Sequence, residues 1–228
     1  MVKEPKVAII DNSLYPDLYN PVGHWKKFLP VPFKAFRAPE GELPDLEAGF
    51  THFILTGSEA SIVERENWVA REVALVQEAY QRNLALLGSC YGHQLLALAL
   101  GGEEYVRRCP HPEVGWIKIK TLVKHSLFDS QKEFFAFSIH FDEVVNLRPP
   151  FRPLASTEAC PVQAMEVEGR RVWGIQSHPE ITISEAQDFL KKLVDRGWPH
   201  GHLYEQALQM APQDSGVIKA IMAFFLSH

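Results

Sequence analysis

Short apolar runs alternate with longer amphipathic stretches along the first half of the chain. Three runs have the length of buried strands and cover residues 7–10, 53–55 and 84–87. Between the second and third run, residues 68–82 repeat apolar side chains in steps of three and four, as one face of a helix does. Strands joined by crossover helices build a mostly parallel sheet. The pattern therefore predicts an α/β fold, with a mostly parallel central sheet flanked by helices.

The second half of the chain begins with a different pattern. Residues 114–154 lack helical periodicity, and they contain short strand-like runs at 116–120, 134–137 and 153–155. Residues 162–167 and 171–176 then form a hairpin pattern around Gly169 and Arg170. These segments predict a small antiparallel extension of the parallel sheet.

Two helical patterns follow the hairpin. Residues 184–196 are amphipathic, and Ser184 is the expected N-cap. The tail over residues 203–226 is helical in pattern and interrupted near Pro212. Its apolar end at residues 224–226 is expected to pack on the body of the protein.

Composition limits the classes of function. A chain of 228 residues with 46% hydrophobic content can bury one sizeable core, so we expect one domain over residues 1–228. The net charge of -5 and the absence of a Lys/Arg cluster argue against nucleic-acid binding. No signal peptide or membrane-spanning run is recognised. The three cysteines are widely spaced and lack a CxxC pair, which favours a cytoplasmic location and argues against a bound metal.

One cysteine stands in a turn suited to nucleophilic chemistry. The segment from Gly88 to Gly92 has the form G-x-C-x-G, with a predicted strand before Cys90 and an apolar stretch after it that ends at Gly101 and Gly102. Such a turn presents its central side chain at the end of a strand and beside a helix N-terminus, which favours the thiolate. The alternative is a buried structural cysteine in a tight turn.

A thiolate nucleophile needs a histidine base and a group that orients the base. The tripeptide His-Pro-Glu occurs twice, beginning at His111 and at His178. The copy at His178 follows an apolar strand pattern and would stand at a strand's carboxyl end, whereas the copy at His111 lies in a proline-rich stretch that predicts a surface loop. Residues two apart in extended backbone face the same side. We therefore predict Cys90, His178 and Glu180 as nucleophile, base and orienting acid.

These two motifs resemble the class I glutamine amidotransferases. The family's G-x-C-x-G-x-Q pattern is present from Gly88 to Gln94, and its G-x-Q-x-H-P-E pattern is present from Gly174 to Glu180. A third segment, Thr56-Gly57-Ser58, resembles the family's oxyanion loop but has Ser58 where a second glycine is usual. This version looks like the stand-alone branch described as GMP synthase-like, which includes γ-glutamyl peptidases. The resemblance implies the flavodoxin-like fold of that family.

The resemblance also implies roles for individual residues. Cys90 would attack a γ-glutamyl carbonyl to form a thioester, and backbone N–H groups of Gly57 and Tyr91 would stabilise the oxyanion. Gln94 and His140 would contact the substrate, the latter through the family's H-x-D-x-V segment. His93 is expected to be structural. No metal and no organic cofactor are required.

Several alternatives remain open at this point. The substrate is glutamine or another γ-glutamyl compound, and the chain has no P-loop or ATP-pyrophosphatase motif of its own, so released ammonia would pass to a separate synthetase subunit or to water. A cysteine α/β-hydrolase is a weaker alternative, because its acid normally precedes the histidine. A catalytically silent regulator of a synthetase is the third, and the Ser58 departure is the feature that favours it.

Overall fold

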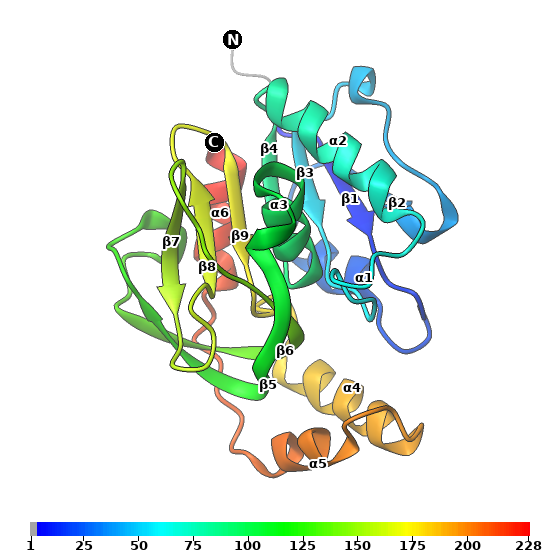
Figure 1. The fold of residues 1–228 in the computed structure, drawn as a ribbon, viewed down its shortest axis with the longest axis vertical. Helices are drawn as coiled ribbons and strands as arrows, with labels where there is room; N and C mark the ends of the chain where they lie inside the picture. The colour runs from blue at the N-terminus through cyan, green and yellow to red at the C-terminus, as the bar shows by residue number, and fades with distance from the viewer. Residues whose placement is uncertain (1–3) are drawn as a thin grey trace.

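The computed structural model describes residues 4–228, and the strands of that range form one nine-stranded sheet (Figure 1). In chain order the strands are β1 (Val7–Asp11), β2 (Phe33–Arg37), β3 (His52–Leu55), β4 (Ala85–Ser89), β5 (Val106–Thr121), β6 (Glu133–Val144), β7 (Phe151–Ser156), β8 (Ala164–Val167) and β9 (Val172–Ile175). Their order across the sheet is β2-β1-β3-β4-β9-β8-β7-β5-β6. Neighbours from β2 to β9 are parallel, and those from β9 to β6 are antiparallel. The predicted α/β fold with an antiparallel extension is confirmed.

Helices cover both faces of the sheet and its curved end (Figure 1). They are α1 (Pro21–Trp25), α2 (Val69–Gln81), α3 (Tyr91–Gly101), α4 (Ile183–Asp195), α5 (Gly201–Gln209) and α6 (Ile218–Ser227). Short 3-10 turns occur at Lys26–Phe28, Ala38–Glu40, Leu46–Ala48, Glu103–Tyr105 and Ser126–Phe128. The apolar face of α2 and α3 packs on one side of β1, β3 and β4, and α1 and α6 pack on the other side. The helices α4 and α5 pack against β5 and β6 in a third cluster.

The C-terminal helix closes the second core. Phe225 is completely buried and meets the ring of Trp173 edge-on at 6.4 Å. The expectation that the apolar end of the tail packs on the body of the protein is confirmed. The interruption near Pro212 is also present, since residues 210–217 separate α5 from α6.

The start of α4 differs from the prediction. Thr182, rather than Ser184, is the N-cap, and it forms a capping box with Glu185 in which each side chain bonds the other residue's backbone N–H. The prediction of Ser184 was wrong because the helix begins one residue earlier, at Ile183. A capping box satisfies two backbone donors at once, so Thr182 and Glu185 are the better pair.

The predicted loop around His111 was also wrong. His111 lies inside β5, where the pairing of β5 with β6 shifts between Arg108 and Glu113. The two prolines beside His111 remove backbone donors at this irregularity, where no ladder bond is needed. The side chain of His111 is exposed, as the prediction of a surface position requires.

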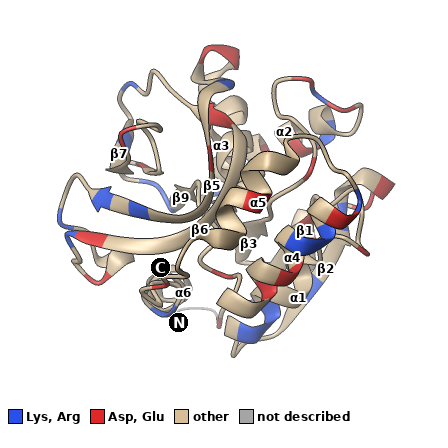
Figure 2. Ribbon diagram, turned by 90° about the horizontal axis from the view of Figure 1, so that it is seen from below, with Lys and Arg blue, Asp and Glu red and all other residues tan. Residues whose placement is uncertain are grey.

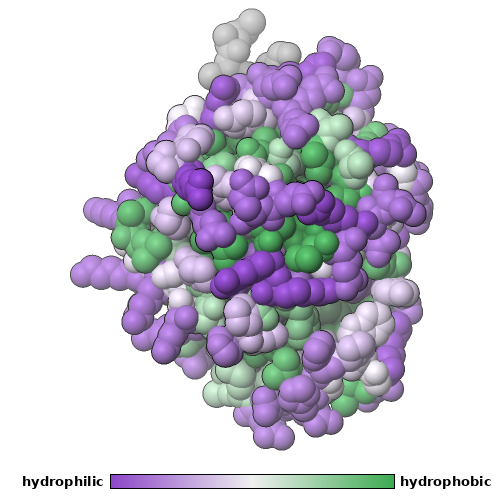
Figure 3. Space-filling view, viewed as in Figure 1, coloured by the Kyte–Doolittle hydropathy of each residue, from purple (hydrophilic) through white to green (hydrophobic). Residues whose placement is uncertain are grey.

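The surface carries both signs of charge. Acidic and basic residues are interspersed over the ribbon and occur together on α4 (Figure 2). On the face seen in Figure 1, hydrophilic residues separate the apolar ones into small groups (Figure 3). No helix within residues 4–228 is long and apolar enough to cross a bilayer.

Candidate active site

Cys90 occupies a strained turn between β4 and α3. Its backbone has φ 49° and ψ −106°, a region that side chains other than glycine rarely adopt, and it is the N-cap of α3. A side chain on Gly92 would collide with the carbonyl of Leu55, and one on Gly88 would collide with the backbone of Gly92. The glycines of the G-x-C-x-G motif therefore let β3, β4 and α3 meet closely enough to form this turn.

His178 and Glu180 lie just beyond the carboxyl end of β9, the strand next to β4. Oε1 of Glu180 is 2.9 Å from Nδ1 of His178, and the same oxygen accepts a hydrogen bond from the hydroxyl of Ser89 at 3.2 Å. Burial by itself lowers the pKa of His178, but the negative charges of Glu180 and Cys90 raise it to about 10. Because Glu180 engages Nδ1, Nε2 is left for a reacting group.

The loop that follows β3 faces this histidine. A Cβ on Gly57 would lie 2.7 Å from Cε1 of His178, so only glycine leaves room for the imidazole. Asn12 holds the loop by donating to the carbonyl of Thr56 at 3.2 Å. Within residues 4–228, no hydrogen bond uses the backbone N–H of Gly57 or of Tyr91. Both donors are thus available beside Cys90.

Ser58 stands where the resembling family usually carries a second glycine. Its hydroxyl accepts the backbone N–H of Ala60 at 2.9 Å. The side chain is engaged in this local turn, and Ser58 still lines the pocket that contains Cys90. The departure from two glycines therefore leaves the loop intact.

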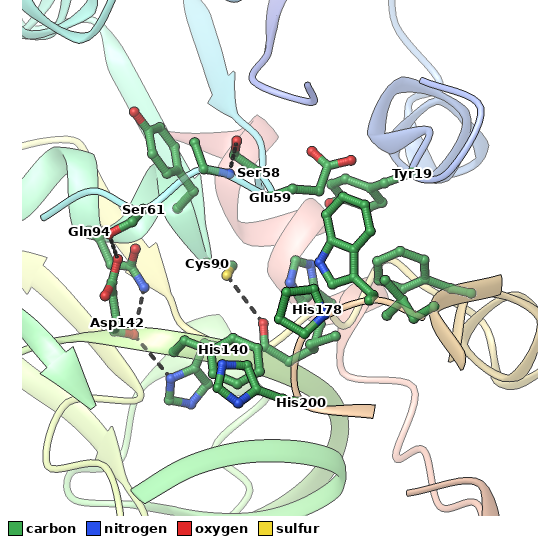
Figure 4. Close-up of a pocket in the computed structure, with 18 of the residues that line it drawn as sticks. Tyr19, Ser58, Glu59, Ser61, Cys90, Gln94, His140, Asp142, His178 and His200 are labelled. Carbon is green, nitrogen blue, oxygen red and sulfur yellow. Dashed lines mark hydrogen bonds between the residues drawn. The ribbon is translucent and has the colours of Figure 1, made fainter. Parts of the chain in front are cut away.

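A cavity of about 370 Å³ opens over Cys90. Figure 4 shows Cys90 between Gln94 and Asp142 on one side and His178 and Tyr19 on the other. The thiol of Cys90 points to the carbonyl of Ile139 at 3.6 Å. The volume is in the range of small-molecule pockets. Together these features make the cavity the candidate active site.

Gln94 borders this cavity from the first turns of α3. Its Nε2 donates to the carbonyl of Asp142 at 2.8 Å and to Oε1 of Gln176 at 3.2 Å. The carboxylate of Asp142 in turn accepts from the hydroxyl of Ser61 at 2.6 Å and pairs with Arg108 at 3.2 Å. Gln94 thus fixes the segment of β6 that forms one wall of the pocket.

The side chain of His140 is engaged by protein groups on both ring nitrogens. Nε2 lies 3.0 Å from Glu113, and Nδ1 lies 3.1 Å from the carbonyl of Asp142 and 3.2 Å from the sulfur of Cys109. Glu113 belongs to the His-Pro-Glu copy that was set aside as a surface loop. Its histidine is exposed, but its glutamate is buried and holds His140.

Glu113, His140 and Cys160 are the one group in the described residues whose ligand atoms lie close enough to hold a metal ion, within 4.8 Å of one another. Both carboxylate oxygens of Glu113 are already used, one by Thr157 at 2.7 Å and the other by His140 and Gln163. The cluster therefore forms a hydrogen-bond network behind the pocket wall.

His93 follows the motif cysteine but faces away from the cavity. It is completely buried, its ring packs on Gly174, and its Nε2 lies 3.2 Å from the carbonyl of Val162. Burial lowers the pKa of His93 to about 3, so the imidazole is neutral. The structural role expected for His93 agrees with this placement.

The glutamine amidotransferase class-I family model matches residues 43–195, a range that contains Cys90, His178 and Glu180. The chain belongs to the class-I glutamine amidotransferase family. Within this family the relatives include the glutamine-hydrolysing GMP synthase of Aeropyrum pernix, 35% identical over 179 residues that cover 75% of this chain and 33% of that protein. A single subunit of the glutamine-hydrolysing GMP synthase of Thermococcus kodakarensis is 35% identical over 113 residues, which cover 49% of this chain and 59% of that relative. The matches thus span less than two thirds of these relatives' own length.

Solved structures of glutamine amidotransferases share the fold. The crystal structure of a glutamine amidotransferase from Thermotoga maritima superposes with a TM-score of 0.75 and covers 99% of this chain and 100% of its own. Its sequence is 19% identical. The agreement over the whole length shows that the fold extends beyond the region matched by the family model.

Several residues of the site were not found from the class-I motifs. Tyr19, Glu59 and Trp198 line the cavity, and they come from segments outside every recognised motif. No local pattern marks them, because each reaches the cavity only through the tertiary fold. Asp142 is different, since the H-x-D-x-V segment that suggested His140 also contains it.

Proposed function

We propose that this chain hydrolyses the γ-amide of glutamine, or of a γ-glutamyl compound, through a thioester on Cys90. The observation that carries the proposal is the convergence of Cys90, His178 and Glu180 on one cavity, with Glu180 2.9 Å from the far nitrogen of the imidazole. This is the arrangement that cysteine nucleophiles use. The names of the relatives, which describe glutamine-hydrolysing enzymes, support the same chemistry.

The proposed reaction has two halves. In the first, the Cys90 sulfur attacks the γ-carbonyl carbon, and His178 gives a proton to the nitrogen that leaves as ammonia or an amine. In the second, a water gives a proton to His178 as its oxygen attacks the thioester carbonyl. The C–S bond then breaks, and Cys90 returns as the thiolate beside protonated His178. Glu180 holds the tautomer and orientation of the ring throughout.

The oxyanion formed in each half needs hydrogen-bond donors. We assign the backbone N–H groups of Gly57 and Tyr91 to this role, because both face Cys90 and neither is used within the described residues. Donors of this kind typically contribute on the order of 3 to 4 kcal/mol to lowering a barrier. The close approach of Gly57 to His178 keeps one donor beside the base.

Gln94 and His140 are assigned to substrate binding in different ways. The Nε2 of Gln94 is used by the protein, so its Oε1 is the atom we propose to accept a substrate N–H. The ring nitrogens of His140 are both used, so we propose that it acts by holding the wall from Ile139 to Asp142 in place.

The acceptor of the released nitrogen is a further part of the proposal. Relatives named as one subunit of a GMP synthase suggest that a separate synthetase subunit receives the ammonia. Hydrolysis of a γ-glutamyl compound without such a partner is the second candidate, and the cavity of about 370 Å³, larger than a glutamine side chain needs, favours it. We further propose that residues 1–228 act as one domain in the cytoplasm.

A catalytically silent regulator is the remaining alternative. The three side chains of the proposed triad are in place, and Ser58 leaves the oxyanion loop intact, so the geometry favours an active enzyme. The cysteine α/β-hydrolase alternative is wrong, because the chain belongs to the class-I amidotransferase family.

Substrate release assays test this proposal. Purified wild-type protein is incubated with glutamine and with a panel of γ-glutamyl peptides, and ammonia and free amine are measured. Cys90→Ala is the matched control, since it removes only the sulfur. Release by the wild type and none by Cys90→Ala is the expected result. Turnover of neither class by the wild type, alone or with a GMP synthetase subunit, would contradict the proposed function.

A further inference from the structure

A tyrosine hydroxyl in the wall of the candidate site has no partner. Tyr19 lies between β1 and α1 and is 4% exposed. Its Oη is buried and forms no hydrogen bond with any of the residues from 4 to 228. A buried hydroxyl without a partner is unfavourable by about 1–3 kcal/mol. The side chain nevertheless lines the cavity that contains Cys90 and His178.

The ring of Tyr19 is fixed in this position. It stacks on His24 with ring centroids 5.9 Å apart and on Phe189 with centroids 5.5 Å apart. Its backbone N–H donates to the carbonyl of Tyr15 at 3.0 Å. Packing on two faces leaves the hydroxyl one direction, which Figure 4 shows as the side of the pocket that Glu59 and His178 occupy.

The hydroxyl stands close to the proposed base. The ring of Tyr19 meets that of His178 edge-on, with centroids 6.0 Å apart. A Cβ built on Gly57 would lie 2.8 Å from Oη of Tyr19 and 2.7 Å from Cε1 of His178. These two distances limit the separation of Oη and Cε1 to about 5.5 Å at most. Two hydrogen bonds of about 2.8 Å through one small group span a gap of this size.

We propose that Tyr19 is a further catalytic residue, whose hydroxyl hydrogen-bonds the nitrogen that leaves the substrate and then the water that replaces it next to His178. The inference rests on the proposed function. The leaving nitrogen and the attacking water both exchange a proton with Nε2 of His178, so they occupy the same place in the two halves of the reaction. Tyr19 accepts a hydrogen bond from that group or donates one to it and transfers no proton.

The hydroxyl stays protonated while it does this. Burial, followed by the charges of Glu180 and Cys90, raises the pKa of Tyr19 well above its ordinary value. A neutral hydroxyl both donates and accepts, which suits a position that first holds a nitrogen and then a water. Its proton cannot compete with that of His178.

The test uses Tyr19→Phe, which removes only the unpartnered hydroxyl and keeps both ring stacks. Because no hydrogen bond within the described residues is lost, we expect the thermal unfolding midpoint to stay at or above that of the wild type. Tyr105→Phe is the matched control, since Tyr105 is a buried tyrosine that packs on Phe151 and lies outside the cavity.

Two readouts separate a catalytic role from a structural one. For Tyr19→Phe, kcat for glutamine hydrolysis should fall by about tenfold while KM changes by less than about twofold, since one hydrogen bond to the reacting group is lost. Hydroxylamine offered as a second acyl acceptor is a stronger nucleophile than water. The share of the thioester that it captures should therefore rise in Tyr19→Phe and not in Tyr105→Phe.

The outcomes also distinguish this inference from the proposed function. An active wild type with a Tyr19→Phe variant of equal kcat overturns the role of Tyr19 alone. A lower kcat with an unchanged share of hydroxamate product also overturns it, because the loss is then structural. A wild type that releases neither ammonia nor amine instead contradicts the proposed function itself.

Discussion

Replacing Glu180 by glutamine removes the charge that keeps His178 protonated. The exchange conserves shape, and the amide oxygen of glutamine can still accept the hydrogen bonds from His178 and Ser89. Both His178 and Glu180 are buried, so water screens their interaction little. The variant therefore changes the electrostatics of the base with little change in its geometry.

The expected effect is large. Two unit charges about 4 Å apart attract by about 4 kcal/mol at an effective dielectric constant of about 20, which corresponds to roughly three orders of magnitude in an equilibrium constant. In the wild type this attraction, with that of Cys90, raises the pKa of His178 to about 10. In Glu180→Gln the imidazolium that stabilises a thiolate at Cys90 becomes scarce at pH 7.

Alkylation by iodoacetamide, followed at the Cys90 peptide by mass spectrometry, measures this directly. The wild-type rate should be nearly constant from pH 6 to 9, because His178 stays protonated over that range. The Glu180→Gln rate at pH 7 should be about 100-fold lower or less, with a similar loss of kcat for glutamine.

Glu185→Gln provides the matched control. Glu185 lies five residues further on, pairs with His24 at 3.2 Å and does not touch His178. Its variant should alkylate at the wild-type rate. If Glu180→Gln also alkylates within about threefold of the wild type, the electrostatic argument for His178 and Glu180 is refuted.

Three further predictions follow from particular contacts. Gly57→Ala puts a Cβ 2.7 Å from Cε1 of His178, so kcat should fall at least about 100-fold with an unchanged circular dichroism spectrum; near-normal kcat would contradict the packing. Burial raises the pKa of Glu72 to about 8, above that of the unfolded chain, so the folded state keeps a proton that the unfolded state loses as pH rises from about 5 to 8. Stability of the wild type therefore falls across that window, and Glu72→Gln should abolish this fall in denaturant titrations; an equal fall in both proteins would show that Glu72 is not responsible. Thr182→Ala should destabilise the protein by about 1 kcal/mol in urea unfolding and Ser184→Ala by much less, and equal effects would contradict the capping box.

Most of the parallel core was predictable from the sequence because its strands are continuous apolar runs. β2 was not, since its segment Phe33–Arg37 alternates apolar and basic residues and lies at the edge of the sheet, half-exposed. Edge strands need less apolar surface than central ones. Only the pairing with β1 identifies this segment as a strand.

The candidate site divides in the same way. Cys90 and Gly57 are recognisable because backbone geometry restricts the residues around them, and a strained turn or a close approach leaves a glycine pattern in the sequence. Tyr19 leaves no such pattern, because it reaches the cavity only by stacking between His24 and Phe189. Local periodicity carries no information about contacts of this kind.

The two His-Pro-Glu copies show a third situation. Choosing His178 over His111 rested on the strand that precedes each copy, and the structure places only His178 beside Cys90. The role of Glu113 could not be foreseen, since its partner His140 lies on the neighbouring strand 27 residues away. Identical tripeptides thus contribute a base in one place and a buried support in the other.

Mass detection of a glutamyl adduct on Cys90 tests the central proposal most directly. The wild type and Cys90→Ser are mixed with glutamine or an electrophilic glutamine analogue, quenched in acid and digested, and the peptide that contains residue 90 is weighed. The account predicts a thioester or alkyl adduct on Cys90 of the wild type and no adduct on Cys109 or Cys160. Turnover of glutamine with no adduct on Cys90, or equal turnover by Cys90→Ser, would contradict it.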